Sequence, residues 1–389
     1  MDGLGKKRII YFDIAKGIGI ILVLIGHLQT DTIFSYSPYI LSLCSWIFSF
    51  HMALFFIISG MLISCKREEE RDLKEAVKKK FRSIMIPYFW FSLIYIFIVL
   101  YSLLISKVVP LKTLFIQLWY VAGMYGMNVL WFLPALFATE VLFLYVFKRF
   151  ERRKAVIVII ILNIAAAVIN SLRAYLPGEP EIYERVNELM ITLTRPVFAS
   201  IYILTGYFFY KGLEIFRSKV RNPNIIETLL LPLLLAANIY LNRINRPVDF
   251  RSEVFNNYFL YYMCSVCGSL FIILLSCVLS EIRINPVRKS NGSQNTDTVP
   301  DKTDEDGRFA LLRFYGVNSL VFMAVHNNSS VRNFAERAAM YLNQYLTRAR
   351  GYICYMTVIA ICLIYVTLTI LLINRFFPFL TGKPLKQKK

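Results

Sequence analysis

Residues 11–28 read YFDIAKGIGIILVLIGHL, and the organisation of the whole chain follows from this stretch. It is apolar enough to cross a bilayer, yet it carries Asp13, Lys16 and His27. Ionisable side chains at membrane depth are costly, and by default they mark a functional site that faces a protein interior or a water-lined cavity. We therefore predict a transmembrane helix that presents functional side chains to such an interior.

The spacing of these ionisable residues places two of them on one side of the predicted helix. Lys16 and His27 are eleven residues apart, so at about 100° per residue they differ by only about 20° around the axis. Along the axis they are separated by roughly 16 Å at 1.5 Å per residue. Asp13 precedes Lys16 by one turn and can neutralise its charge as an i,i+3 neighbour. Glycines in the same segment leave room for another helix or a ligand to come close.

Composition identifies the class of protein. The chain has 389 residues, of which 57% are hydrophobic and 18% are charged, and its mean hydropathy is +0.53. Soluble domains have about 45–50% apolar residues, so we predict an all-α, multi-pass membrane protein. The net charge of +19 does not indicate nucleic-acid binding, because the charges lie in short loops between apolar runs. That placement is the one that orients membrane proteins, and it makes membrane lipids the expected surroundings.

Apolar runs of about 20 residues, each long enough for one crossing, predict about ten transmembrane helices. The expected spans are 9–30, 38–65, 84–106, 128–148, 155–173, 195–212, 224–242, 256–280, 312–330 and 351–375. If the N-terminus is cytoplasmic, the cytoplasmic segments hold 31 Lys and Arg residues and the external segments hold 12. The positive-inside bias therefore predicts that both termini are cytoplasmic. We expect the protein to lie in the cytoplasmic (inner) membrane.

Three connecting segments carry further expectations. Residues 66–82 (KREEERDLKEAVKKKFR) are typical of a charged amphipathic helix that leads into the third span. Residues 107–127 are too long for a tight turn and rich in aromatic side chains, so we expect them at the outer membrane interface or re-entering the membrane. Residues 285–307 are polar and non-periodic, which predicts a disordered cytoplasmic insertion in an otherwise single domain, 1–389.

All three histidines of the chain, His27, His51 and His326, fall inside predicted spans. A single membrane histidine is often only a hydrogen-bonded packing residue. Three out of three, each in a polar or aromatic local context, favour a functional role for at least one of them. Two carboxylates, Asp13 and Glu140, are also placed at membrane depth, where they could orient or neutralise cations. For Glu140 a structural salt bridge is at least as good an interpretation.

Several motifs, in order along the chain, resemble the signatures of the membrane-bound acyltransferase family 3. They are RIIYFDIAKGIGIILVLIGH, FHMALFFIISGML, FRSIMIPYFWFSL, LWFLPALF, RPVFASIYILTGYFF and YGVNSLVFMAVHN. The nearest branch by resemblance is the fucose 4-O-acetylase-like enzymes. The resemblance implies an O-acetyltransferase that moves an acyl group from cytoplasmic acetyl-CoA, or another short acyl-CoA, to a sugar hydroxyl. The acceptor would be a surface polysaccharide, a lipid-linked glycan or a related molecule, and no metal is expected.

The resemblance also assigns residues. The family's basic-x10-His pattern falls on Lys16 and His27, with Lys instead of Arg, and its basic pair before the third span falls on Lys79 and Arg82. Ala53 stands where the family usually has Pro. Lys16, Lys79 and Arg82 are the expected ligands of the coenzyme phosphates, although a lysine cannot grip a phosphate in the bidentate manner of arginine.

The chemistry of the reaction agrees with this assignment. A sugar hydroxyl needs a general base to attack a thioester, and imidazole suits that task because its pKa lies near working pH. His27 is the first candidate for the base, and His326 or His51 the next. Trp131, Phe132 and Arg195 are weaker site candidates, because aromatic residues and arginines at helix ends commonly serve as membrane anchors.

Two other classes of protein stay open on the residues alone. Ten spans with buried ionisable residues suit a proton-coupled transporter or a glycan exporter equally well. A transporter would more often show paired repeats with broken helices in both halves, which the sequence does not indicate. A regulatory membrane protein with a degenerate site is the third possibility, and the intact His27 argues against it. The resemblance favours the acyltransferase.

Overall fold

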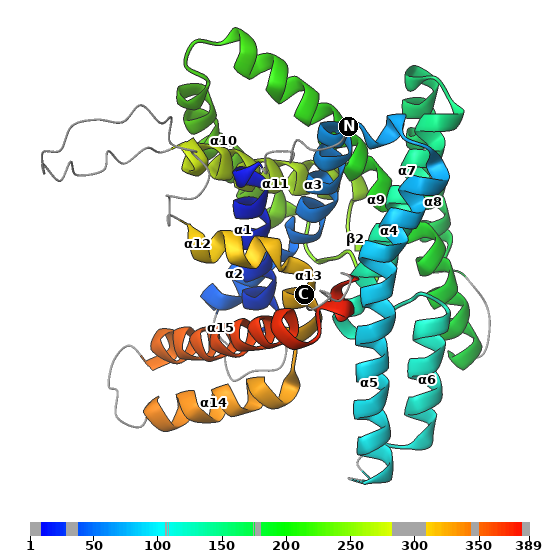
Figure 1. Ribbon diagram of the computed structural model, residues 1–389, viewed down its shortest axis with the longest axis vertical. Helices are drawn as coiled ribbons and strands as arrows, with labels where there is room; N and C mark the ends of the chain where they lie inside the picture. Colours follow the sequence, from blue (N-terminus) through cyan, green and yellow to red (C-terminus); the bar gives the residue numbers. More distant parts are fainter. Residues whose placement is uncertain are drawn as a thin grey trace, which may run out of the picture.

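The computed structural model describes residues 9–28, 38–105, 107, 109–173, 175, 180–281, 309–343 and 350–382. Helices dominate this part of the chain (Figure 1). The α-helices are α1 (Ile10–His27), α2 (Pro38–Phe48), α3 (His51–Lys66), α4 (Leu73–Lys80), α5 (Ile86–Leu104), α6 (Leu111–Ala122), α7 (Phe132–Arg149), α8 (Arg152–Arg173), α9 (Pro180–Lys219), α10 (Pro223–Ile244), α11 (Tyr258–Glu281), α12 (Ala310–Val317), α13 (Ser319–Val325), α14 (Ser329–Asn343) and α15 (Arg350–Phe376).

Shorter elements connect these helices. One-turn helices occupy η1 (Glu68–Glu70), η3 (Asn128–Trp131) and η4 (Pro378–Thr381), and a π-helical turn, η2 (Phe81–Met85), joins α4 to α5. Two strands, β1 (Val248–Asp249) and β2 (Val254–Phe255), pair antiparallel between α10 and α11. This small hairpin reaches the interior of the protein.

Nine segments of the described chain are long and apolar enough to cross a membrane, which confirms an all-α integral membrane protein. The continuous span predicted over 312–330 is wrong. The chain breaks there at Asn318, between α12 and α13. The Asn318 side chain donates to the Phe314 carbonyl at 2.8 Å and accepts from the Asn374 amide at 2.8 Å. Such side-chain bonds compete with the helical backbone ladder, and this is the physical reason for the break.

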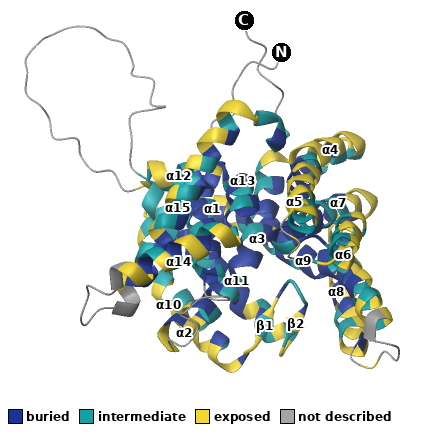
Figure 2. Ribbon diagram, turned by 90° about the horizontal axis from the view of Figure 1, so that it is seen from below, coloured by how far each residue is buried: buried dark blue, intermediate teal, exposed yellow. Residues whose placement is uncertain are grey.

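The helices form an inner group and an outer group (Figure 2). In the most apolar 18-residue stretch of each candidate span, 83% of the residues of α2–α3 are buried, but only 22% of those of α8 and 11% of those of α10. The outer helices expose large apolar side chains such as Ile161 and Leu233, as expected of surfaces that face lipid. Helices α1, α3, α7 and α9 therefore form the interior in which polar side chains can be held.

Helices α3 and α9 cross at van der Waals distance through a reciprocal pair of glycines. A Cβ atom on Gly60 would overlap the Ile203 carbonyl, and one on Gly206 would overlap the Ile57 carbonyl. Small residues permit this close backbone approach in membrane helices. The crossing joins the FHMALFFIISGML and RPVFASIYILTGYFF stretches, which lie far apart in the sequence.

A second reciprocal crossing joins α1 to α12. Here a Cβ atom on Gly17 would overlap the Leu312 carbonyl, and one on Gly316 would overlap the Asp13 carbonyl. The broken helix is thereby docked against the half of α1 that carries Lys16. The chain that follows, α13, then lies beside the second half of α1.

Two of the connecting segments are described. The charged segment forms η1 and then α4, whose first turn is capped by Asp72 through bonds from the Lys74 and Glu75 amides at 2.9 and 3.2 Å. Within 107–127 lies α6, which packs against α5 and has no buried residue. Its expected interfacial or re-entrant placement stays a prediction. The expected insertion 285–307 lies outside the described residues.

Candidate active site

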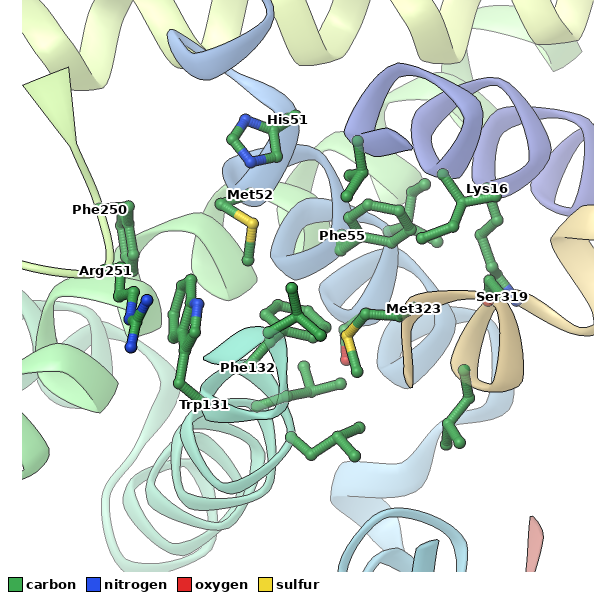
Figure 3. A pocket seen from close by; sticks show the side chains of 18 of the residues that line it. Lys16, His51, Met52, Phe55, Trp131, Phe132, Phe250, Arg251, Ser319 and Met323 are labelled. Atoms are coloured by element: carbon green, nitrogen blue, oxygen red, sulfur yellow. The ribbon is translucent and has the colours of Figure 1, made fainter. Parts of the chain in front are cut away.

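A cavity of about 770 Å³ lies between α1, α3, η2, α7, α13 and the loop that carries β1. Its middle is lined by apolar side chains, among them Met52, Phe55, Phe132 and Met323, which Figure 3 shows pointing into the same space. Polar side chains come from both halves of α1 and α3, from η2 and from the β-hairpin loop. One continuous cavity therefore connects residues that are up to 311 positions apart, from Lys16 to Asn327.

All three histidines line this cavity. His27 ends α1, His51 begins α3 and His326 directly follows α13. The rings of His27 and His326 have centroids 5.3 Å apart. The Phe48 ring lies between His27 and His51, with its centroid 5.9 Å from that of His27 and 5.2 Å from that of His51. The three imidazoles thus form one cluster, which we call the histidine cluster.

Hydrogen bonds indicate the tautomers of two of these rings. His51 Nδ1 lies 3.0 Å from the Ile47 carbonyl and His326 Nδ1 lies 2.7 Å from the Met323 carbonyl. A carbonyl oxygen can only accept, so each neutral ring carries its proton on Nδ1 and leaves Nε2 as an acceptor. His326 Nε2 is buried without a hydrogen-bond partner in the described part of the chain. The lone pair of this nitrogen is therefore left for a bound group.

A second polar group lines the cavity away from the histidine cluster and centres on Lys80. Its ammonium lies 3.1 Å from Glu140 Oε2 and 2.7 Å from Glu68 Oε2. Ser59 donates to the other oxygen of Glu140. We call Ser59, Lys80 and Glu140 the lysine cluster, with Glu68 behind it. Burial of Glu68 opposes its ionisation, but the attraction of Lys80 and Lys79 holds the pKa of Glu68 below its ordinary value.

Lys16 also lines the cavity. Its ammonium lies 4.0 Å from a carboxylate oxygen of Asp13, which is itself buried and does not line the cavity. The sequence-predicted pair Lys16 and His27 thus faces one space. Within the described residues, no cluster of His, Cys, Asp or Glu side chains is arranged to hold a metal ion.

The β-hairpin loop forms part of the cavity wall near the histidine cluster. Asp249, Phe250 and Arg251 line it, and Figure 3 shows Phe250 and Arg251 next to Trp131. The Phe250 and Trp131 rings stack at 6.3 Å with an interplanar angle of 22°. None of the three loop residues stands out in the sequence, because the loop has no periodicity and its position depends on contacts with distant helices.

Two buried side chains hold this loop in place. Arg195 donates to the Arg251 carbonyl at 2.6 Å and to the Tyr125 carbonyl at 3.3 Å. Glu253 accepts from Arg173 at 2.7 Å and from Thr194 at 2.8 Å. Burial raises the pKa of the Glu253 carboxyl to about 7, and the nearby hydrogen bonds and guanidinium only partly offset this effect.

Comparison with known proteins gives a family for this arrangement. The family model described as "Acyltransferase domain", that of acyltransferase family 3, matches residues 9–373. The chain belongs to acyltransferase family 3. A curated relative of this acyltransferase is "Nodulation protein NolL" of Mesorhizobium japonicum (strain LMG 29417 / CECT 9101 / MAFF 303099), 35% identical over 116 residues. That match covers 28% of this chain and 28% of the relative. No solved structure matches the acyltransferase.

The structure separates the motif residues of this family 3 acyltransferase into two sets. Lys16 and His27, the basic-x10-His pair, line the cavity, as do His51, His326 and Glu140. The glycines Gly17, Gly60, Gly206 and Gly316 instead permit the two helix crossings described above. The motifs therefore combine side chains that face the cavity with small residues that bring the helices together.

Lys79 and Arg82 do not line the cavity of the acyltransferase. The side chain of Lys79 is 54% exposed and lies 3.4 Å from Glu68, while Arg82 is exposed. Lys80, which lies in the same run of lysines but outside the family's basic pair, is the one that reaches the interior. A role for Lys79 and Arg82 in binding the coenzyme stays a prediction.

The weaker candidates also have definite positions. Trp131 and Phe132 line the cavity of the acyltransferase, and Arg195 lies behind Trp131 with its guanidinium 4.7 Å from the indole ring. Arg195 does not stand at a helix end, because it lies inside α9, which begins at Pro180.

Proposed function

We propose that this acyltransferase moves an acetyl group, or another short acyl group, from cytoplasmic acyl-CoA to a sugar hydroxyl. The acceptor would be a surface polysaccharide or a lipid-linked glycan, and the enzyme would lie in the cytoplasmic membrane. The observation that carries the proposal is the single cavity, with the histidine cluster at one side and the lysine cluster at the other. The fucose 4-O-acetylase-like branch is part of the same proposal.

The histidine cluster supplies the base that the reaction needs. The acceptor oxygen attacks the thioester carbonyl carbon, the carbon–sulfur bond breaks, and the hydroxyl proton passes through an imidazole to the departing thiolate. We assign the proton transfer to His27, and the orphan Nε2 of His326, whose ring lies 5.3 Å away, makes it the second candidate. A positioned general base contributes typically about 10²–10⁴-fold in rate.

The donor would arrive from the other side. Lys16 and Lys80 place ammonium groups on the cavity wall, and Lys79 and Arg82 add charge at its outside. Charge-assisted bonds to phosphate are about twice as strong as neutral ones. On the positive-inside argument this end faces the cytoplasm, where the coenzyme is found. The apolar middle of the cavity would then take the thin arm that links the phosphates to the thioester.

The test is a comparison of three variants in the full-length protein, purified and reconstituted in nanodiscs. His27→Ala should insert, bind acetyl-CoA and lose about 10²–10⁴-fold of its turnover. His326→Ala and His51→Ala serve as matched controls from the same cluster. Near-wild-type turnover of His27→Ala would move the base to whichever control variant has lost activity. Wild-type protein that transfers no acyl group to any glycan acceptor would overturn the proposed function.

A further inference from the structure

The turn from Val248 to Arg251 brings a cation to the histidine cluster. Arg251 lines the cavity and is half-buried, while its neighbour Asp249 is exposed at the edge. One carboxylate oxygen of Asp249 accepts the backbone N–H of Arg251 at 2.9 Å. The Arg251 carbonyl is held by Arg195. The backbone of the turn is therefore fixed from both sides, and the Arg251 side chain is left to face the cavity.

Within the described part of the chain, Arg251 differs from Lys16 and Lys80, the other two cations on the cavity wall, in having no carboxylate beside its charged group. Lys16 lies beside Asp13, and Lys80 lies between two glutamates. The described residues form no ion pair with the Arg251 guanidinium. A half-buried guanidinium without a carboxylate partner is an attractive site for an anion, and its planar fork matches carboxylate and phosphate groups.

An aromatic surface lies next to this guanidinium. The stacked rings of Trp131 and Phe250 are buried in the protein and line the cavity, and the Arg195 guanidinium lies 4.7 Å from the centre of the indole ring. The apolar C–H face of a pyranose ring can pack on the parts of these rings that line the cavity, and aromatic rings give large contact area with few rotatable bonds. A sugar in this position would lie next to the histidine cluster.

We propose that Trp131, Phe250 and Arg251 form the acceptor subsite, and that Arg251 selects a pyranoside bearing a carboxylate or a phosphate. This inference rests on the proposed function for its chemistry, but the binding that it describes can be measured without acyl transfer. It narrows the acceptor from any sugar hydroxyl to an anionic sugar, such as a uronate or a sugar phosphate.

The experiment uses three octyl β-glycosides as probes, each below its critical micelle concentration: the glucoside, the glucuronide and the glucose 6-phosphate. Binding to the reconstituted full-length protein is followed by calorimetry, and transfer from labelled acetyl-CoA gives kcat/KM for each acceptor. Wild-type protein should prefer one or both anionic probes over the glucoside. A charge-assisted hydrogen bond is worth about 1.5–3 kcal/mol, so the preference should be about 10- to 100-fold.

Arg251→Gln should reduce that preference to near unity, and Arg251→Lys should keep part of it because the charge remains. The matched control is Arg243→Gln, an exposed arginine of α10 that does not line the cavity. It should leave the preference unchanged. Selective binding of only the glucuronide or only the phosphate would identify which anion the site takes.

Two results would overturn the inference. One is equal binding of the neutral and anionic probes by the wild-type protein. The other is an Arg251→Gln variant that keeps the anionic preference. Selective, Arg251-dependent binding without any acyl transfer would support the inference while contradicting the proposed function. Acyl transfer to neutral and anionic glycosides alike would support the proposed function and contradict the inference about Arg251. A failure of one proposal can therefore be told from a failure of the other.

Discussion

Replacing Arg195 by lysine tests whether the acceptor side of the cavity is held in place by one buried guanidinium. Arg195 is 1% exposed, and its two terminal nitrogens reach the carbonyls of Arg251 and Tyr125, which belong to different loops. Its planar group also lies 4.7 Å from the centre of the Trp131 ring. A lysine ammonium is a single point charge on a flexible stem, so it cannot reproduce the two separate donor positions from which the guanidinium nitrogens reach these carbonyls.

The magnitude follows from the bond that is lost. A buried carbonyl left without a donor costs about 1–3 kcal/mol. Because that carbonyl belongs either to the turn carrying Arg251 or to the segment before Trp131, the cost falls on the acceptor side. Arg195→Lys should therefore raise the acceptor KM by about 5- to 100-fold. The donor KM should stay near the wild-type value, because Arg195 does not line the cavity and its contacts are with the Arg251 and Tyr125 carbonyls, not with the lysine cluster.

The assay is steady-state transfer from labelled acetyl-CoA in nanodiscs, with acceptor and donor varied in separate experiments. Arg243→Lys, an exposed substitution of the same type, is the control. A thermal unfolding midpoint measured on each variant separates loss of the subsite from loss of the fold. An unchanged acceptor KM, or a rise in the donor KM alone, would refute the positioning role of Arg195.

The remaining predictions concern the fold. Gly206→Leu should lower the thermal unfolding midpoint, because overpacking costs about 1–3 kcal/mol. Gly212→Leu on the same helix has open space around the new side chain and should leave the midpoint nearly unchanged. Equal effects of the two substitutions would contradict the close helix crossing at Gly206. Glu253→Gln should change the pH dependence of stability. The folded pKa of Glu253 is raised to about 7, so its protonated form stabilises the wild type at low pH, and this advantage over the variant should be lost as pH rises from about 4.5 through 7. A midpoint difference that is flat across this range would contradict it.

The membrane class and the side of α1 that faces the cavity could be predicted from the sequence, because both depend on local properties. Hydropathy defines a span, and the angle between Lys16 and His27 depends only on helical geometry. The same reasoning failed for the broken helix at Asn318. An apolar run predicts a span by its composition, but a side-chain bond to Asn374, 56 residues away, favours the break.

The assignment of Lys79 and Arg82, and not Lys80, to the predicted site shows a second limit of prediction from the sequence. Adjacent helical residues differ by about 100° in direction, and which one faces inward depends on how α4 packs against α7 and η1. The partners of Lys80, Glu68 and Glu140, lie in other elements. The loop carrying Arg251 is a third case, because it is positioned by α8 and α9 and has no local pattern of its own.

The arrangement of the cavity bears on how transfer to water is avoided in the proposed reaction. A thioester carbonyl that entered from the lysine cluster would reach the histidine cluster by crossing the apolar middle, where Met52, Phe55 and Met323 point into the space. Water in such an apolar region lacks the polar partners that an ordered site needs, so the thioester would meet few competing nucleophiles before the acceptor binds. An acceptor that covers Trp131 and pairs with Arg251 would place its hydroxyl beside the imidazoles and close the remaining opening. Selectivity for the acceptor and protection of the thioester would then follow from the same contacts.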